Sequence, residues 1–174
     1  MRSTHTDDAV PFRIVVMGVS GCGKSSISNA LAARFNARFV EADEFHPGAS
    51  IDKMTVGIAL TDDDRWPWLA RLERELERDE RVVMACSALR RRYRDILRRA
   101  KHVRFVFLDV SYAEAFRRVT SRTGHYMGAS LLASQFDALE RPTDGETDVI
   151  TIDAAGPFDV VLETAIAAAG FSTR

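Results

Sequence analysis

Disulfide-forming cysteine, long apolar runs and excess charge are all scarce in this chain of 174 residues. Its two cysteines, Cys22 and Cys86, lie in a glycine-rich loop and at the end of an apolar stretch, which is typical of a reducing cytoplasm and not of a disulfide framework. No apolar run approaches the roughly 20 residues that span a bilayer. The net charge of −1 gives no overall field that would attract nucleic acid. The composition therefore predicts one globular, cytoplasmic domain that binds neither membrane nor nucleic acid.

Lysine is also scarce, since only Lys24, Lys53 and Lys101 are found among the 24 lysine and arginine residues. Lys24 lies in the sequence Gly-Val-Ser-Gly-Cys-Gly-Lys-Ser, which spans Gly18–Ser25 and fits the Walker A pattern G-x-x-x-x-G-K-S. A lysine at this position, in a chain that otherwise prefers arginine, indicates that a compact ammonium group is required.

The residues on both sides support this motif. An apolar, β-branched run at 13–17 predicts a buried strand before it, and apolar residues at helical spacing predict a helix over 26–35 after it. On such a unit the loop amides surround a phosphate, Lys24 reaches the β- and γ-phosphates, and the Ser25 hydroxyl binds Mg²⁺. We therefore expect ATP and Mg²⁺ as cofactors. The expected nucleotide-binding residues are Gly18, Val19, Ser20, Gly21, Cys22, Gly23, Lys24, Ser25, Ser26 and Arg118.

Strands and helices alternate along the rest of the chain. Further strands are predicted at 38–42, 81–86, 104–108 and 149–152, and helices at 51–55, 66–78, 90–99, 112–123, 130–139 and 158–169. This alternation predicts an α/β fold with a five-stranded parallel sheet and helices on both faces. We expect residues 1–11 to be a disordered tail, residues 12–174 to be a single domain, and residues from about 118 to 130 to form a mobile lid.

Several polar residues follow predicted strands, where open α/β sheets bind their ligands. Asp43 and His46 follow the second strand, although a turn would also use an aspartate there. Asp64 ends an acidic run that can equally cap a helix, and Arg65 follows that run. Lys53 is a candidate for binding an anionic substrate, or else a solvated surface lysine.

Two pairs of arginines are spaced four residues apart, so that each pair shares a helix face. Arg90 and Arg94 follow the third strand and are candidates for substrate contact, whereas Arg118 and Arg122 are expected to close over a transferred phosphoryl group. Each pair can instead be an exposed face, and the arginine-rich helix could be read as a nucleic-acid patch, although it lacks interleaved aromatic residues. The expected catalytic residues are Lys24, Asp43, Arg118 and Arg122.

Taken together, these motifs resemble the bacterial-type gluconokinases. The residues that carry the resemblance are the phosphate loop, Asp43-Glu44-Phe45-His46-Pro47, Lys53-Met54, Leu60 to Leu69, Cys86 to Leu89, Tyr93-Arg94-Asp95, Gly124-His125 and Gln135-Phe136. The resemblance implies the adenylate-kinase-like group of P-loop kinases, the phosphorylation of D-gluconate at the expense of ATP, and a homodimer. The expected substrate-binding residues are Asp43, His46, Lys53, Asp64, Arg65, Arg90, Arg94 and His125.

Other functions remain open at this point. The same fold serves shikimate kinases and nucleoside-monophosphate kinases, and a fold does not determine a substrate. A nucleotide-dependent switch that binds a partner would also need the phosphate loop, but it would not need a second substrate pocket. For a kinase we expect direct in-line transfer, with Asp43 orienting or deprotonating the accepting hydroxyl.

Overall fold

The computed structural model describes residues 10–121 and 129–170, apart from the side chains of residues 129 and 130. Its centre is a sheet of five parallel strands in the order β2-β3-β1-β4-β5. The strands are β1 (Phe12–Met17), β2 (Arg38–Glu41), β3 (Arg81–Ala85), β4 (Val103–Asp109) and β5 (Val149–Asp153). The expected five-stranded parallel sheet is therefore confirmed, with strand ends within about one residue of those predicted.

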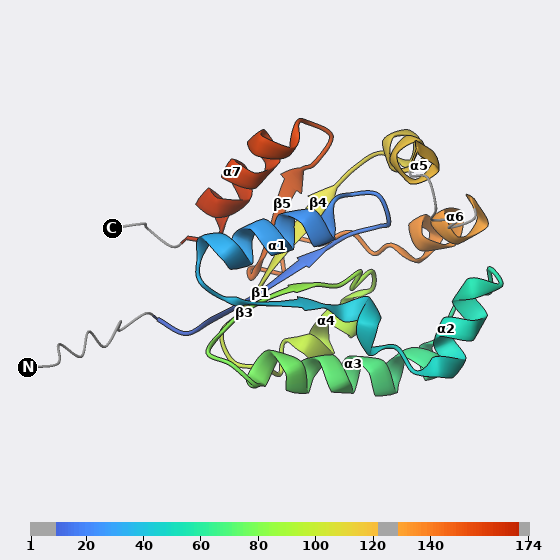
Figure 1. Cartoon of the computed structure of the whole chain (residues 1–174), viewed down its shortest axis with the longest axis horizontal. Coiled ribbons are helices and arrows are strands. Elements are labelled where there is room, and N and C mark those ends of the chain that lie inside the picture. The colour runs from blue at the N-terminus through green and yellow to red at the C-terminus, as the bar shows by residue number, and fades with distance from the viewer. Residues whose placement is uncertain (1–9, 122–128, 171–174) are drawn as a thin grey trace, which may run out of the picture.

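Helices cover both faces of the sheet (Figure 1). The α-helices are α1 (Lys24–Arg34), α2 (Gly48–Thr55), α3 (Asp62–Glu77), α4 (Arg91–Leu97), α5 (Tyr112–Ser121), α6 (Ala129–Ala138) and α7 (Phe158–Ala168), and a 3₁₀ turn, η1, spans Ala42–Phe45. Figure 1 shows α1 and α7 on one face and α3 and α4 on the other, while α2, α5 and α6 lie beyond the carboxyl ends of the strands.

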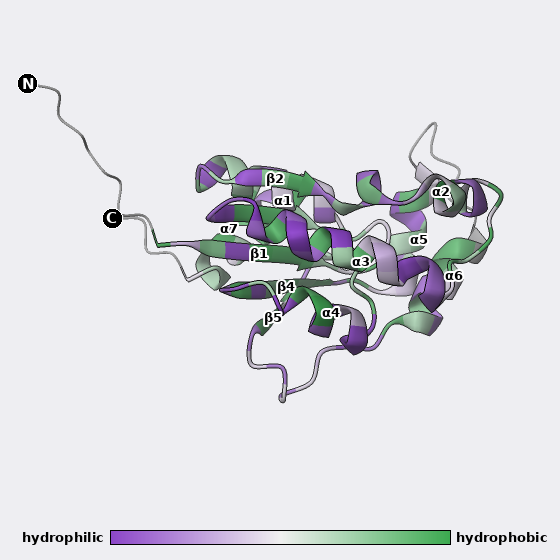
Figure 2. Cartoon of the chain, turned by 90° about the horizontal axis from the view of Figure 1, so that it is seen from below, coloured by the Kyte–Doolittle hydropathy of each residue, from purple (hydrophilic) through white to green (hydrophobic). Residues whose placement is uncertain are grey.

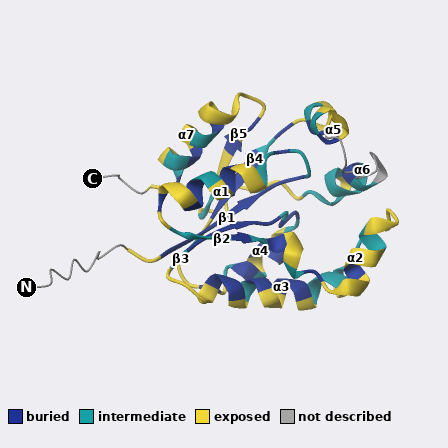
Figure 3. Cartoon of the chain, viewed as in Figure 1, coloured by how far each residue is buried: buried dark blue, intermediate teal, exposed yellow. Residues whose placement is uncertain are grey.

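The central strand β1 is buried on both faces, which explains its unbroken apolar sequence. Because strand side chains alternate, Ile14 and Val16 join the core under α1 and α7, whereas Val15 and Met17 join the core under α3 and α4. Figure 2 shows the mainly hydrophobic strands, and Figure 3 shows the central strands largely buried between helices whose outer faces are exposed. The sheet therefore holds its carboxyl edge rigidly between two cores.

Helix α3 begins four residues before the predicted start at 66. Thr61 is its N-cap, and its hydroxyl accepts from the Asp64 amide at 3.3 Å while the Asp64 carboxylate accepts from the Thr61 amide at 2.9 Å. This reciprocal capping box fixes the start of the helix. The predicted start at 66 would place Pro67 in the first turn, which proline favours, but Pro67 lies further inside the helix.

Some expectations fall outside the described residues. These include most of the tail and the central part of the lid, residues 122–128, so the division into tail, domain and lid stays a prediction. Within the described parts of the chain, none of the helices has the length and apolar character needed to cross a membrane.

Replacing Thr61 by Ala should lower the free energy of unfolding by about 1 kcal/mol, because it removes the hydroxyl that caps α3. Urea denaturation measures the change. Thr61→Ser keeps the hydroxyl and is the matched control, which should unfold close to the wild type. Equal stability of the Ala variant and the wild type would show that the capping box contributes nothing.

Candidate active site

The loop between β1 and α1 has the backbone shape of a phosphate cradle. Gly18, Gly21 and Gly23 have φ values of 144°, 81° and 99°, which side chains rarely adopt. A Cβ atom at Gly18 would lie 2.8 Å from the Leu108 carbonyl oxygen, and one at Gly21 would lie 2.8 Å from the Ala115 carbonyl oxygen. No side chain caps α1, so the first amides of this helix remain available to a bound anion. The loop therefore fits a nucleotide phosphate chain.

The polar groups of the loop are placed as the motif requires. The Lys24 ammonium donates to the Val19 carbonyl oxygen at 3.0 Å, and no carboxylate pairs with Lys24 in the described parts of the chain. Ser25 and Ser26 lie in the first turn of α1, while Val19 and Cys22 are buried. Burial raises the pKa of the Cys22 thiol, which therefore stays protonated at neutral pH.

Glu41 is a residue that the sequence reasoning missed. Its half-buried carboxyl, at the end of β2, lies near the Ser25 hydroxyl, and burial raises its pKa. Mg²⁺ prefers oxygen ligands and usually needs only one or two carboxylates in addition to phosphate oxygens. Ser25 and Glu41 together fit that ion. One feature of the sequence could have indicated Glu41. It is an acidic residue at the carboxyl end of a predicted strand, two residues before Asp43.

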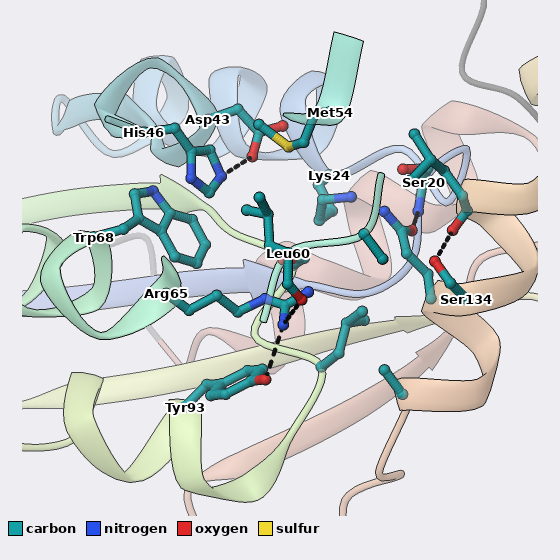
Figure 4. Close-up of a pocket in the computed structure, with 16 residues that line it drawn as sticks. Ser20, Lys24, Asp43, His46, Met54, Leu60, Arg65, Trp68, Tyr93 and Ser134 are labelled. Carbon is teal, nitrogen blue, oxygen red and sulfur yellow. Dashed lines mark hydrogen bonds and ion pairs between the residues drawn. The ribbon is translucent and has the colours of Figure 1, made fainter. Parts of the chain in front are cut away.

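A cleft joins this loop to η1, α2, α3, α4 and α6. Figure 4 shows Ser20 on one side of it, His46 and Trp68 on the other, and Lys24, Asp43 and Arg65 between them. Tyr93 from α4 and a wall from α6 complete it; the residues of that wall are Leu131, Ser134, Gln135 and Ala138. The structure thus places Lys24, Asp43, His46 and Arg65 around one cleft.

His46 is packed against the wall of the cleft. Its ring stacks on Trp68 with 4.2 Å between ring centroids, and the Trp68 indole N–H donates to the Ala42 carbonyl oxygen at 2.8 Å. The His46 Nε2 atom lies 3.8 Å from the Asp43 carboxylate. Burial lowers the pKa of His46, so its imidazole is neutral at pH 7 and can donate or accept a hydrogen bond.

Arg65 is held by neutral groups. Its guanidinium donates to the Leu60 carbonyl oxygen at 2.6 Å and to the Tyr93 hydroxyl at 3.2 Å. Tyr93 in turn donates to Asp62 at 2.5 Å, and Arg92 pairs with the same carboxylate. No carboxylate forms an ion pair with Arg65 in the described parts of the chain, so its charge is available to an anion in the cleft.

Other candidate cations are already paired. Lys53 donates to both Asp64 oxygens, at 2.7 and 2.9 Å, and these contacts hold the pKa of Asp64 at about 2. Asp64 also caps α3, as described above, and Arg90 lies 3.9 Å from Asp62. None of Lys53, Asp64 and Arg90 lines the cleft.

Arg94 is placed differently from the sequence-based expectation. Its side chain is only 1% exposed and makes two hydrogen bonds to Glu146, at 2.7 and 2.5 Å. It also donates to the carbonyl oxygens of Ala88 and Glu140. The expectation that Arg94 contacts a substrate is therefore corrected, because its guanidinium braces α4 against the segment before β5.

Comparison with known proteins shows the family. A family model described as shikimate kinase matches residues 20–153. The thermosensitive gluconokinase of Escherichia coli K12 is 45% identical over 80% of this chain and 77% of its own length, and the gluconokinase of Gluconobacter oxydans is 44% identical over 90% of each. This chain belongs to the gluconokinase family.

Solved structures agree with this family. A gluconokinase from Sinorhizobium meliloti superposes with a TM-score of 0.84 at 47% identity, covering 90% of each chain. A shikimate kinase from Bacteroides thetaiotaomicron superposes with a TM-score of 0.64 at 20% identity, which shows a shared fold alone. A shikimate-type kinase is therefore not favoured over a gluconokinase.

The remaining expected residues of this gluconokinase-family chain belong to the segment from about 118 to 130 that is predicted to form a lid. Arg118 donates to the Gly21 carbonyl oxygen of the phosphate loop at 3.4 Å and to the Ala154 carbonyl oxygen at 2.8 Å, and it pairs with Glu114 at 2.6 Å. It is thus beside the loop but does not line the cleft. Arg122 and His125 lie outside the described residues.

Replacing Arg94 by Met should lower the free energy of unfolding by about 3–5 kcal/mol, because it leaves the buried Glu146 carboxylate with too few partners. Arg90→Met removes a more exposed arginine and is the control, for which we expect less than about 1 kcal/mol. Chemical denaturation compares the two variants. Similar stabilities would contradict the bracing role assigned to Arg94.

Proposed function

We propose that this chain transfers the γ-phosphoryl group of ATP to the terminal hydroxyl of D-gluconate, giving 6-phospho-D-gluconate and ADP. One observation carries the proposal: the cleft is lined by two cations without a carboxylate partner among the described residues, Lys24 and Arg65, and by the Asp43 carboxylate. A triphosphate and a sugar acid supply the two anions, and a terminal hydroxyl supplies the proton that a carboxylate can accept.

The nucleotide end follows from the phosphate loop. Its amides and Lys24 would hold the triphosphate, and Ser25 and Glu41 would hold Mg²⁺, which neutralises charge on the phosphate oxygens when it is bound. Family membership implies ATP as the donor, whereas Mg²⁺ is inferred from these oxygen atoms.

The sugar-acid end follows from Arg65. A guanidinium matches a carboxylate in geometry and charge, and Arg65 makes only neutral contacts within the described residues. Arg65 and Lys24 line the same cleft, so an extended molecule can place one end, its acid group, at Arg65 and the other end, its reacting hydroxyl, toward Lys24. Asp43 and His46 provide partners for hydroxyl groups between these ends.

The chemical step is a direct displacement. The bond between the γ-phosphorus and the β–γ bridging oxygen breaks, and a bond forms from the γ-phosphorus to the terminal hydroxyl oxygen of gluconate. That hydroxyl loses its proton to Asp43, from which it passes to solvent. Lys24 balances the charge on the transferring group, and Arg118 and Arg122 are proposed to add to it when the lid closes.

The other partner and location expectations stay proposals. These are a homodimer, a cytoplasmic location and the absence of nucleic-acid and membrane partners. The switch alternative is less well supported, because a switch does not need the second, arginine-lined end of the cleft.

Release of ADP in the presence of candidate acceptors tests the proposed function. We expect saturable turnover with D-gluconate and Mg-ATP, and little turnover with shikimate or nucleoside monophosphates. Turnover with one of those acceptors and not with gluconate would overturn the assignment. A rate of ATP hydrolysis that is the same with and without every acceptor would instead favour the nucleotide-dependent switch.

Replacing Arg65 by Met should raise the KM for gluconate about 10- to 100-fold, because it removes a charged hydrogen bond to the acid group. The KM for ATP should change little. Lys53→Met is the control, since Lys53 already pairs with Asp64. Steady-state kinetics with each substrate varied in turn makes the comparison. A larger effect on gluconate from Lys53→Met than from Arg65→Met would contradict the assignment.

Replacing Asp43 by Asn should reduce kcat by about 10²- to 10⁴-fold, because an amide cannot accept the hydroxyl proton. ATP binding, measured by calorimetry without gluconate, should be nearly unchanged. A variant that retains wild-type kcat would exclude Asp43 from proton transfer.

A further inference from the structure

One phosphate-loop amide is bound by a side chain from the opposite wall of the cleft. The Ser20 N–H donates to the Gln135 Oε1 atom at 2.7 Å. Gln135 lies 115 residues further along the chain, in α6, and both residues line the cleft. This contact ties the loop that binds phosphate to the helix that forms the wall of the acceptor site.

The contact fixes which way the carboxamide faces. A backbone N–H can only donate, so the oxygen of the carboxamide must face Ser20. The usual uncertainty between the oxygen and nitrogen of a glutamine is thereby removed. The NH₂ group is at the other end of the planar amide and offers two donors to the cleft.

The surrounding groups indicate what these donors meet. The triphosphate end already has the loop amides and Lys24, whose ammonium contacts Val19 beside Ser20. The acceptor end has the Asp43 carboxylate, which can only accept, and a neutral His46. A molecule with a hydroxyl on nearly every carbon needs donors as well as acceptors along its length. The Gln135 NH₂ group supplies a donor in the cleft beside the phosphate loop.

We propose that Gln135 is a further substrate-binding residue, whose oxygen is held by the Ser20 amide and whose NH₂ group donates to a hydroxyl oxygen of the sugar acid near the transferred phosphoryl group. The inference rests on the proposed function. It also makes Gln135 a specificity residue, because an acceptor without that hydroxyl would leave this donor in the cleft without a partner.

Two nearly isosteric variants separate binding from bracing. Gln135→Glu keeps an oxygen for the Ser20 amide but has no NH₂ group, and Gln135→Met has neither. We expect both to raise the KM for gluconate about tenfold or more, with the KM for ATP changed by less than about threefold. Thermal melting shows whether both variants are folded. If Gln135→Met does not fold, the kinetics of Gln135→Glu alone test the proposal.

Four results would overturn the proposal. A Gln135→Glu variant with wild-type KM for gluconate would show that bracing of Ser20 is the whole role. An equal rise of the KM for gluconate and the KM for ATP in Gln135→Glu would assign the residue to nucleotide binding. Tighter ATP binding in Gln135→Met, with an unchanged KM for gluconate, would assign it in the same way. Wild-type protein without gluconate-dependent turnover would contradict the proposed function itself, and the inference with it.

Discussion

The neutralisation of cations inside the protein decides which of them can bind a substrate. Arg94 and Lys53 carry the same charge as Arg65, but each forms hydrogen bonds to a carboxylate of this chain, Glu146 and Asp64 respectively. A guanidinium or ammonium group that is already paired gains little free energy from binding a second anion. If it moves to bind that anion, its first carboxylate partner is left unpaired, which is unfavourable. Arg65 instead rests on a carbonyl and a hydroxyl.

The elements around Arg65 keep its charge uncompensated. Tyr93 lies between Arg65 and Asp62, and it donates to that carboxylate, which Arg92 also neutralises. Asp62 therefore interacts with Arg65 only at longer range, and the two form no ion pair within the described residues. In the same cleft, Lys24 likewise contacts only a carbonyl oxygen within the described residues. Two cations that line one cleft without a carboxylate partner among the described residues are suited to a reaction between a triphosphate and a second anion.

Much of this arrangement could be predicted from the sequence, because local patterns determine it. The unbroken apolar run of β1 and the glycines of the phosphate loop are short-range features, and Asp43 was placed by its position after a strand. The partners of Arg94 could not be predicted, because Glu146 is 52 residues away in sequence and follows no local pattern. The predicted start of α3 was wrong for a different reason. Pro67 favoured a start at 66, but the capping box of Thr61 starts the helix earlier. The contact between Ser20 and Gln135 also depends on the folded chain.

A crystal structure with gluconate and a non-hydrolysable ATP analogue tests the central claim most directly. The account predicts that the gluconate carboxylate lies about 2.7–2.9 Å from the Arg65 guanidinium, with the terminal hydroxyl between Asp43 and the γ-phosphate. Arg94 should keep its contacts with Glu146. A gluconate carboxylate bound by Arg94 or Lys53, with Arg65 left empty, would contradict the account.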